Sequence, residues 1–177
     1  MGLFLNVSQV WAQKLEINTG YYSLSATNST GTKASVTSFT SCRVGYRHPV
    51  RTKWELTAGY TVILASDLAY GFDFGADYFY LTRANPIKAQ SENVTLNLKE
   101  VFRPYVGLTF TQRQFQELSS QLAGFGVRFG FEYDTSWKFL ASRGISLKGE
   151  VRFCALDGTG KTQGDELFAG MGIVYHF

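Results

Sequence analysis

The chain has 177 residues, a net charge of +3 and 18% charged residues. This length favours one domain, and the charged share lies below the ~25% of an average soluble domain, so the chain is either unusually buried or outside water. The composition, with 16% aromatic residues and only three prolines, excludes a disordered chain, a coiled coil and collagen. So mild a charge does not by itself indicate nucleic-acid binding.

The first 12 residues have the order of a truncated secretory signal peptide. A mostly apolar stretch at residues 3–7 is followed by a small residue, Ala12, immediately before Gln13. An apolar core and a cleavage site follow one another in this way, although the positively charged segment that normally precedes them is missing. We interpret residues 1–12 as a signal-peptide remnant or a disordered N-terminus, with a short extra strand as the alternative, and expect the folded domain at 13–177.

From Gln13 onward, apolar residues recur at every second position. The stretch from Trp54 to Leu64 is one example, and Val36 and Val44 fall on the apolar side of another. Because successive side chains of a strand point to opposite faces, each such run predicts a strand with one apolar and one polar face. Turn-forming residues at 28–31, 48–49, 85–86 and 157–160 separate the runs. The sequence therefore predicts an all-β antiparallel meander, which closes into a barrel to remove its edges.

The polar face carries acids and bases in equal number. They are Glu16, Arg43, Arg47, Lys53, Glu55, Asp73, Asp77, Arg128, Glu132, Lys148, Glu150 and Arg152. In a soluble barrel these charges would meet water, whereas in a membrane barrel they would fill the lumen and the apolar face would meet lipid. Periodicity alone does not choose between the two.

Three features favour the membrane barrel. Glycines such as Gly45, Gly59 and Gly107 crowd the polar face, where a narrow lumen needs small residues beside long charged ones. The last run keeps apolar residues at every second position up to Phe177. Aromatic residues also cluster where strands meet turns, as in the interfacial girdles of membrane barrels. We assign to the girdle Tyr46, Trp54, Phe102, Tyr105, Tyr133 and Trp137.

The run Met171, Ile173, Tyr175, Phe177 resembles the carboxy-terminal strand of outer-membrane β-barrels. The segment 103–108 also resembles a strand opening in small barrels of the OmpA transmembrane-domain and opacity-protein type. The resemblance implies a closed, up-and-down transmembrane β-barrel in a bacterial outer membrane, in contact with lipid and lipopolysaccharide and present as a monomer. It implies that the four residues are an assembly signal read by the outer-membrane assembly machinery.

Such barrels have an even number of strands. The chain has nine alternating runs, one more than an eight-stranded barrel needs. The ambiguous region is Asp67 to Arg113. We favour eight strands, at about 14–26, 36–47, 53–65, 70–83, 100–113, 121–134, 144–156 and 166–177. A ten-stranded ring that uses the amino-terminal segment is the alternative. The outer loops are expected near 27–35, 84–92, 114–121 and 157–165.

The charges of the polar face lead to the functional expectation. Unpaired charge in a narrow lumen is costly, so we expect a network of salt bridges that closes the barrel. A structural or surface-interaction role follows. The alternative is a narrow gated channel for ions or small solutes, and a soluble lipocalin-like ligand-binding barrel is a third interpretation.

The sequence offers little support for catalysis, and we expect no enzyme, cofactor, metal or nucleic-acid partner. Residues 155–162 match a relaxed phosphate-loop pattern, but no helix follows them, so we interpret them as a surface hairpin. His48 and His176 lack metal-ligand spacing, and a lipid-modifying enzyme would need a His–Ser pair near the outer rim, which we do not find. Cys42 is expected on the lipid face and Cys154 in the lumen, a poor disulfide pair.

Overall fold

The computed structural model describes residues 13–27, 31, 33–65, 68–80, 87–91, 94–98, 102–115, 121–135, 144–158 and 161–177. The expected signal-peptide remnant at 1–12 and Trp137 lie outside these described residues. Within them, no helix has the length and apolar character needed to cross a membrane.

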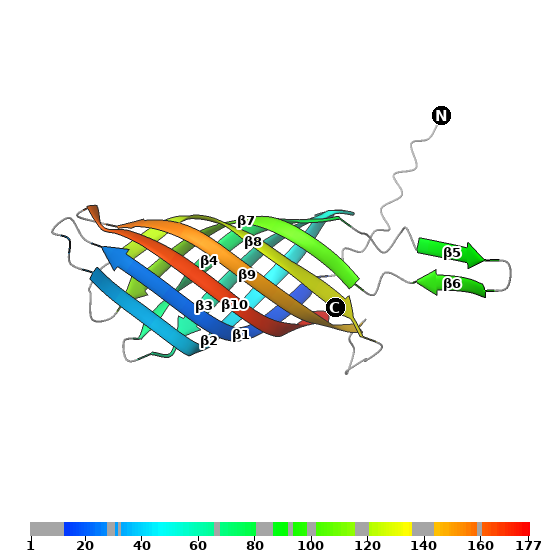
Figure 1. Cartoon of the computed structure of the whole chain (residues 1–177), viewed down its shortest axis with the longest axis horizontal. Helices are drawn as coiled ribbons and strands as arrows, with labels where there is room; N and C mark the ends of the chain where they lie inside the picture. Colours follow the sequence, from blue (N-terminus) through cyan, green and yellow to red (C-terminus); the bar gives the residue numbers. More distant parts are fainter. Residues whose placement is uncertain are drawn as a thin grey trace, which may run out of the picture.

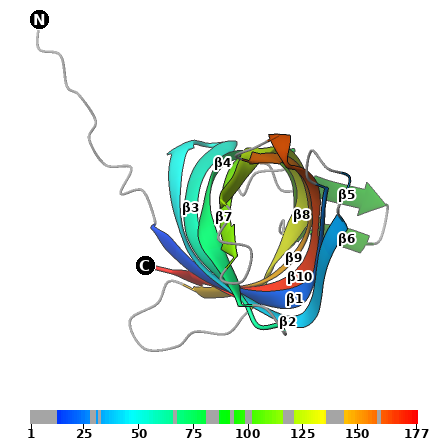
Figure 2. The same ribbon diagram turned by 90° about the vertical axis from the view of Figure 1, so that its left-hand side faces the viewer.

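Eight strands form a closed antiparallel barrel, in the order β1-β10-β9-β8-β7-β4-β3-β2 around the ring (Figures 1 and 2). Their bounds are β1 Lys14–Thr27, β2 Lys33–Arg51, β3 Trp54–Ile63, β4 Ala69–Phe79, β7 Phe102–Phe115, β8 Gln121–Asp134, β9 Gly144–Gly158 and β10 Gln163–His176. The first and last ring strands pair with each other over the whole of β1, from Lys14 opposite His176 to Thr27 opposite Gln163. The predicted eight-stranded all-β barrel is confirmed, and the ten-stranded alternative is wrong.

The surplus run belongs to a separate two-stranded sheet. Strand β5 (Ile87–Ser91) pairs only with β6 (Val94–Leu98), and the pair interrupts the connection between β4 and β7. Figure 1 shows it beyond the end of the barrel at which β1 begins and β10 ends, which we call the termini end. The outer loop expected near 84–92 is therefore wrong, because β4 runs toward this end and β7 starts from it. The connection 64–68 lies at the opposite end instead.

Connections differ in length between the two ends. At the termini end, residues 52–53, 80–101 and 135–143 link the strands, whereas residues 28–32, 64–68, 116–120 and 159–162 do so at the far end. The far end thus has only short connections, and the longest insertion shares an end with the termini.

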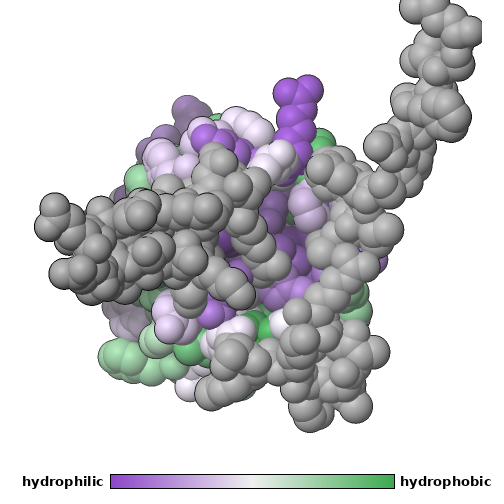
Figure 3. All heavy atoms as spheres, turned by 90° about the vertical axis from the view of Figure 1, so that its right-hand side faces the viewer, coloured by the Kyte–Doolittle hydropathy of each residue, from purple (hydrophilic) through white to green (hydrophobic). Residues whose placement is uncertain are grey.

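The alternation of burial decides which face looks inward. In β1, Glu16 and Asn18 are buried, whereas Leu15 and Ile17 are 38% and 52% exposed. The same pattern recurs around the ring, with polar and charged side chains inside and large apolar ones outside. A space-filling view into the termini end shows hydrophilic residues within the ring and hydrophobic ones at its margin (Figure 3). The interior is not the apolar core of a soluble barrel.

A bulge in β2 reverses the alternation near the far end. The register with β1 shifts between Gly20 and Tyr22. Two β2 hydroxyls bind neighbouring backbones there: Ser38 Oγ donates to the Leu64 carbonyl at 2.5 Å, and Ser41 Oγ donates to that of Gly20 at 2.7 Å. Val36, beyond the bulge, is buried inside the barrel, so its assignment to the outward face is wrong. One extra residue in a strand moves every later side chain to the other face.

Candidate functional site

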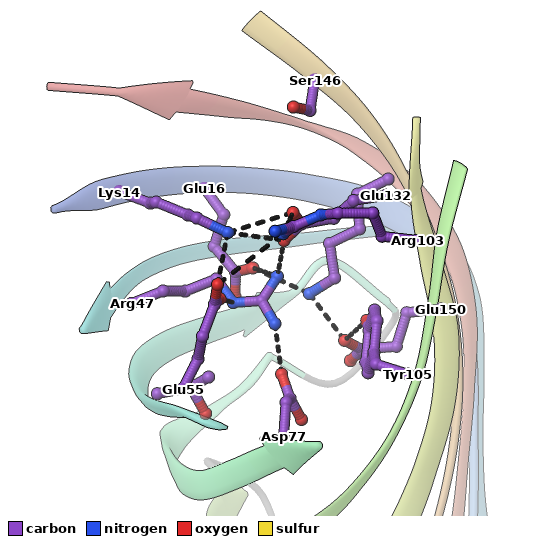
Figure 4. Close-up of polar contacts among 12 residues, drawn as sticks. Lys14, Glu16, Arg47, Glu55, Asp77, Arg103, Tyr105, Glu132, Ser146 and Glu150 are labelled. Atoms are coloured by element: carbon purple, nitrogen blue, oxygen red, sulfur yellow. Dashed lines mark hydrogen bonds and ion pairs between the residues drawn. The ribbon is translucent and has the colours of Figure 1, made fainter. Parts of the chain in front are cut away.

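The lumen holds a network of ion pairs that begins at the termini end. Lys14 Nζ lies 2.6 Å from Glu55 Oε1 and 3.0 Å from Glu132 Oε2. The guanidinium of Arg103, from β7, also reaches both carboxylates, pairing most closely with Glu132. These four groups come from β1, β3, β7 and β8, so the cluster ties strands across the barrel (Figure 4).

Arg47 is the hub of the network. Its guanidinium pairs with Glu132 and Asp77, lies 3.3 Å from Glu55 Oε2 and comes within 3.8 Å of Glu16 Oε2. Figure 4 shows it between these carboxylates. Because the four acids belong to β1, β3, β4 and β8, one β2 side chain connects half of the ring. The side chain is fully buried.

Lys148 carries the network to the middle of the lumen. Its Nζ lies 2.7 Å from Glu16 Oε2 and 2.7 Å from Glu150 Oε2. The Tyr105 hydroxyl donates to the same Glu150 oxygen at 2.9 Å. Nearby, Arg128 Nε donates to Asp77 Oδ1 at 2.5 Å. All of these groups are buried.

A second hub, Asp73, lies nearer the far end. Three guanidinium groups surround it, from Arg43 at 3.3 Å, Arg113 at 2.7 Å and Arg152 at 3.1 Å. The last two also pair with Glu166, each at 2.9 Å. Threonine hydroxyls from β3 and β7 donate to the Asp73 carboxylate as well. A buried carboxylate with this many donors is fully compensated.

Opposite charges nearly balance within the network. Among the described residues it contains eight cations and seven anions. The cations are Lys14, Arg43, Arg47, Arg103, Arg113, Arg128, Lys148 and Arg152, and the anions are Glu16, Glu55, Asp73, Asp77, Glu132, Glu150 and Glu166. Near neutrality removes the large penalty of burying net charge.

The structure places every residue of the predicted network in the lumen except Lys53. Lys53 is exposed in the 52–53 turn, and its Nζ lies 5.8 Å from the centre of the Tyr78 ring. Its assignment was wrong because the alternation of β3 begins only at Trp54. Four network members were missed, and all lie toward strand ends: Lys14, Arg103, Arg113 and Glu166. Each of the four lies an even number of positions from a lumen-facing residue of the same strand. Continuing the alternation to the strand ends would therefore have predicted them.

Glycines make room for the arginines. A Cβ on Gly59 would stand 2.7 Å from Arg43 Nη2, and a Cβ on Gly75 would stand 2.9 Å from Arg128 Nη2. Both distances are shorter than side chains tolerate. The guanidinium groups therefore occupy the space that these glycines leave on the lumen face.

A buried apolar cluster, which we call the apolar plug, lies in the lumen at the far end and was not predicted from the sequence. The cluster has members from every ring strand except β7. Its members are Tyr22, Leu24, Ala26, Val36, Ile63, Ala69, Leu122, Cys154, Leu156 and Phe168. The plug joins the ion network through the Tyr22 hydroxyl, which donates to Glu166 at 2.9 Å. The signal was present in β1, where the inward positions change from Glu16 and Asn18 to Tyr22 and Leu24.

Four predicted girdle residues, Tyr46, Trp54, Phe102 and Tyr133, are exposed on the outer face, 40–49% each. Tyr105 is not: it is buried in the lumen, so its assignment to the girdle is wrong. It is three residues from Phe102 and therefore has the opposite parity. Its ring lies 5.2 Å from that of Phe79, also inside the barrel.

The outward residues of the second half of β10 and the following Phe177 form the apolar row that we interpret as an assembly signal. Met171, Ile173 and Phe177 are 64%, 52% and 51% exposed. The Tyr175 ring lies 4.9 Å from that of Phe177. The structure thus presents this row on the outer surface of the barrel.

A hydroxyl–imidazole pair that the sequence did not reveal lies inside the termini end. Ser146 Oγ is 2.7 Å from His176 Nε2 and also donates to Asp134. The hydroxyl therefore stands between imidazole and carboxylate, whereas in a catalytic triad the imidazole stands in the middle. His48 Nδ1 lies 3.5 Å from the Tyr46 hydroxyl on the outer side.

Neither a disulfide nor a metal cluster is found in the described part of the chain. Cys42 is exposed and Cys154 is buried, both as free thiols, as their opposite faces predicted. No group of three or more histidine, cysteine, aspartate or glutamate side chains is placed to hold a metal ion among the described residues.

Comparisons with known proteins identify the fold. Neisserial surface protein A aligns at a TM-score of 0.57 and 15% identity, covering 93% of this chain and 97% of that one. The N-terminal β-barrel domain of Pseudomonas aeruginosa OprF aligns at 0.51 and 15%, covering 94% and 99%. The outer-membrane protein AlkL aligns at 0.51 and 13%, covering 94% and 90%. No family model and no curated protein sequence matches.

The chain therefore has the fold of the small eight-stranded outer-membrane β-barrels. This confirms the fold that the resemblance of the last strand implied. At such low identities the comparison concerns the fold, and the role of the lumen has to be argued from its own residues.

Proposed function

We propose that the chain is an integral β-barrel of a bacterial outer membrane with a closed lumen and a structural or surface-interaction role. The outer face supports the membrane placement: it exposes large apolar side chains on every ring strand, including Leu108 at 69% and Phe74 at 52%. A soluble protein rarely exposes so continuous an apolar surface. The outward aromatic residues match the interfacial girdles of membrane barrels.

The single observation that supports a closed lumen is the presence of two different barriers, one after the other along the barrel. An eight-stranded ring is just wide enough for its own side chains. Here the ion network occupies the middle and the termini end, and the apolar plug closes the far end. An ion crossing in either direction would have to displace compensated charges and also pass an apolar constriction, which repels it. Transport is therefore not the favoured role.

Single-channel recording in planar lipid bilayers tests this function. The wild-type protein is expected to insert without conductance steps. The double variant Leu24→Ala/Phe168→Ala removes two buried side chains of the plug, so the ion network is the only one of the two barriers left intact. Its conductance is the positive comparison for that of the wild-type protein. Steady, reproducible steps from the wild-type protein would contradict the closed lumen.

The second candidate, a narrow gated channel, has one observation in its favour. Several fully buried polar atoms have no hydrogen-bond partner among the described residues, including both amide atoms of Asn18, Arg128 Nη1 and Glu150 Oε1. Buried polar atoms of this kind usually bind internal water. Water in the middle of the lumen would let charges exchange partners, so rare voltage-dependent openings in the same recordings would favour this candidate over the static barrel.

We also propose that the outward row of β10 contacts the outer-membrane assembly machinery, and that the apolar belt contacts membrane lipid and lipopolysaccharide. Met171, Ile173 and Phe177 of this row are exposed, and Tyr175 is half-buried. Phe177→Ala is expected to reduce the membrane-inserted fraction in cells several-fold, measured by the heat-dependent shift of the folded band in electrophoresis. Phe125→Ala is the control, since Phe125 is outward but lies on β8. Equal insertion of both variants would contradict the proposal.

A further inference from the structure

The charged residues outside the lumen network are divided unequally between the two ends of the barrel. At the termini end, seven basic and three acidic residues occur in the sequence of segments 51–53, 80–101 and 134–143. At the far end, two basic and four acidic residues occur in segments 28–33, 64–68, 116–120 and 157–165. The termini end is therefore strongly basic, whereas the far end is slightly acidic.

Two of these basic residues lie where the outer wall of the barrel reaches the termini end. Arg51 is the last residue of β2 and Lys53 lies in the turn that follows, and both are exposed. Lys53 Nζ lies 5.8 Å from the centre of the Tyr78 ring, on the outward face of β4. That ring packs in turn against Trp54, with the two ring centres 5.1 Å apart. The β2–β3 turn thus presents two cations beside outward aromatic residues, which mark the headgroup level of a membrane barrel.

A hollow in the outer wall adjoins the two cations. It has a volume of about 340 Å³ and is lined by Val50, Arg51, Trp54, Glu55 and Leu56. The one acid of this lining, Glu55, is 5% exposed and pairs in the lumen with Lys14 at 2.6 Å. The hollow therefore has apolar walls and a cationic edge. Two larger hollows in the outer wall have no lysine or arginine among their described lining residues, so the cations set this one apart.

The sign of the charge selects the class of lipid. The far-end connections are the outer loops of the membrane placement proposed above, so the termini end meets the periplasmic leaflet. Arginine and lysine form charge-assisted hydrogen bonds with phosphate oxygens, and basic residues beside a membrane attract anionic headgroups. A zwitterionic headgroup gains less, because the same cations repel its ammonium group.

We propose that the β2–β3 turn is a binding site for an anionic glycerophospholipid of the periplasmic leaflet. Arg51 and Lys53 bind its phosphate, and an acyl chain lies against Val50 and Leu56. Charge complementarity identifies the occupant, and continuity with the lipid-facing wall accounts for the chain. The inference rests on the membrane placement proposed above and is independent of whether the lumen conducts.

The fluorescence of Trp54 tests the site from within it. The other two tryptophans, Trp11 and Trp137, are replaced by phenylalanine, and the full chain is reconstituted into vesicles of phosphatidylglycerol and phosphatidylethanolamine in equal amounts. Bromine atoms on the acyl chains of either lipid quench an indole ring that they contact, so the two degrees of quenching give the relative association constant of the two lipids at Trp54. We expect phosphatidylglycerol to be favoured at least about fivefold, the effect of one cation beside an anionic headgroup layer.

A pair of double variants separates the site from the overall charge of the protein. Arg51→Gln/Lys53→Gln is expected to remove the preference, whereas Lys33→Gln/Lys161→Gln removes two exposed cations from the far end and is expected to leave it unchanged. Both variants are first checked for the folded band in electrophoresis. Equal association of the two lipids with the unsubstituted turn, a preference that survives Arg51→Gln/Lys53→Gln, or an equal loss in both double variants would overturn the site. Absence of quenching by either brominated lipid would instead contradict the membrane placement.

Discussion

Replacing Arg47 by methionine is the sharpest test of the buried ion network. The substitution keeps much of the apolar stem and removes the cation that meets Glu132, Asp77, Glu55 and Glu16. Each of these carboxylates keeps at least one other cation in the network. Breaking a buried ion pair costs ~3–5 kcal/mol, because a charge is left uncompensated. With partial compensation, we expect the free energy of unfolding to fall by about 3 kcal/mol, the lower end of that range.

Equilibrium urea unfolding in lipid vesicles, followed by tryptophan fluorescence, measures this loss. The control is Lys53→Met, which removes an equivalent positive charge from an exposed turn and is expected to change stability by less than ~0.5 kcal/mol. If Arg47→Met unfolds as the control does, the lumen charges are solvated individually. The argument for a closed lumen would then be refuted.

Three further predictions concern the two faces of the barrel. Leu108→Arg, in the middle of an outward strand face, is expected to destabilise the protein in vesicles by ~2–4 kcal/mol, whereas Gln112→Arg nearer the far end costs ~0–1 kcal/mol; equal effects would argue against a lipid-facing surface. Gly59→Ala pushes a methyl group to 2.7 Å from the guanidinium that this glycine accommodates, so the urea midpoint should fall by the equivalent of ~1–3 kcal/mol. Maleimide treatment of the protein folded in lipid vesicles should add no label, because outward Cys42 lies in the lipid-facing belt and Cys154 is buried, and unfolding should make both thiols reactive, as read by mass spectrometry; a label at Cys154 before unfolding would contradict the closed interior.

The barrel could be predicted from the sequence because the two faces of each strand are chemically so different. In β1, for example, charged and apolar residues alternate without interruption from Lys14 to Ile17. Such a pattern fixes strand type and register at the same time, since a slip by one residue would place Glu16 outside and Ile17 inside. The number of strands was harder, because a two-stranded sheet outside the ring shows the same alternation as a ring strand.

The errors within the site have local causes. Lys53 was placed in the lumen because the alternation of inward and outward residues in β3 was extended into the preceding turn. Residues of a turn do not alternate between the two faces of a sheet. Val36 was placed outside because the bulge at Ser38–Ser41 depends on pairing with β1, which the sequence of β2 alone does not specify. Partner identity could not be predicted at all: that Arg47 meets acids from four strands is a property of the closed ring.

The seam between the first and last strands limits how a molecule could leave the interior of the barrel. Its pairing is unbroken from Lys14 opposite His176 to Thr27 opposite Gln163, without a bulge or a gap. A barrel that releases cargo sideways needs a weak seam through which its wall can part. The pairing of the first and last strands offers no such weak seam, so a sideways exit would not open at the closure of this barrel.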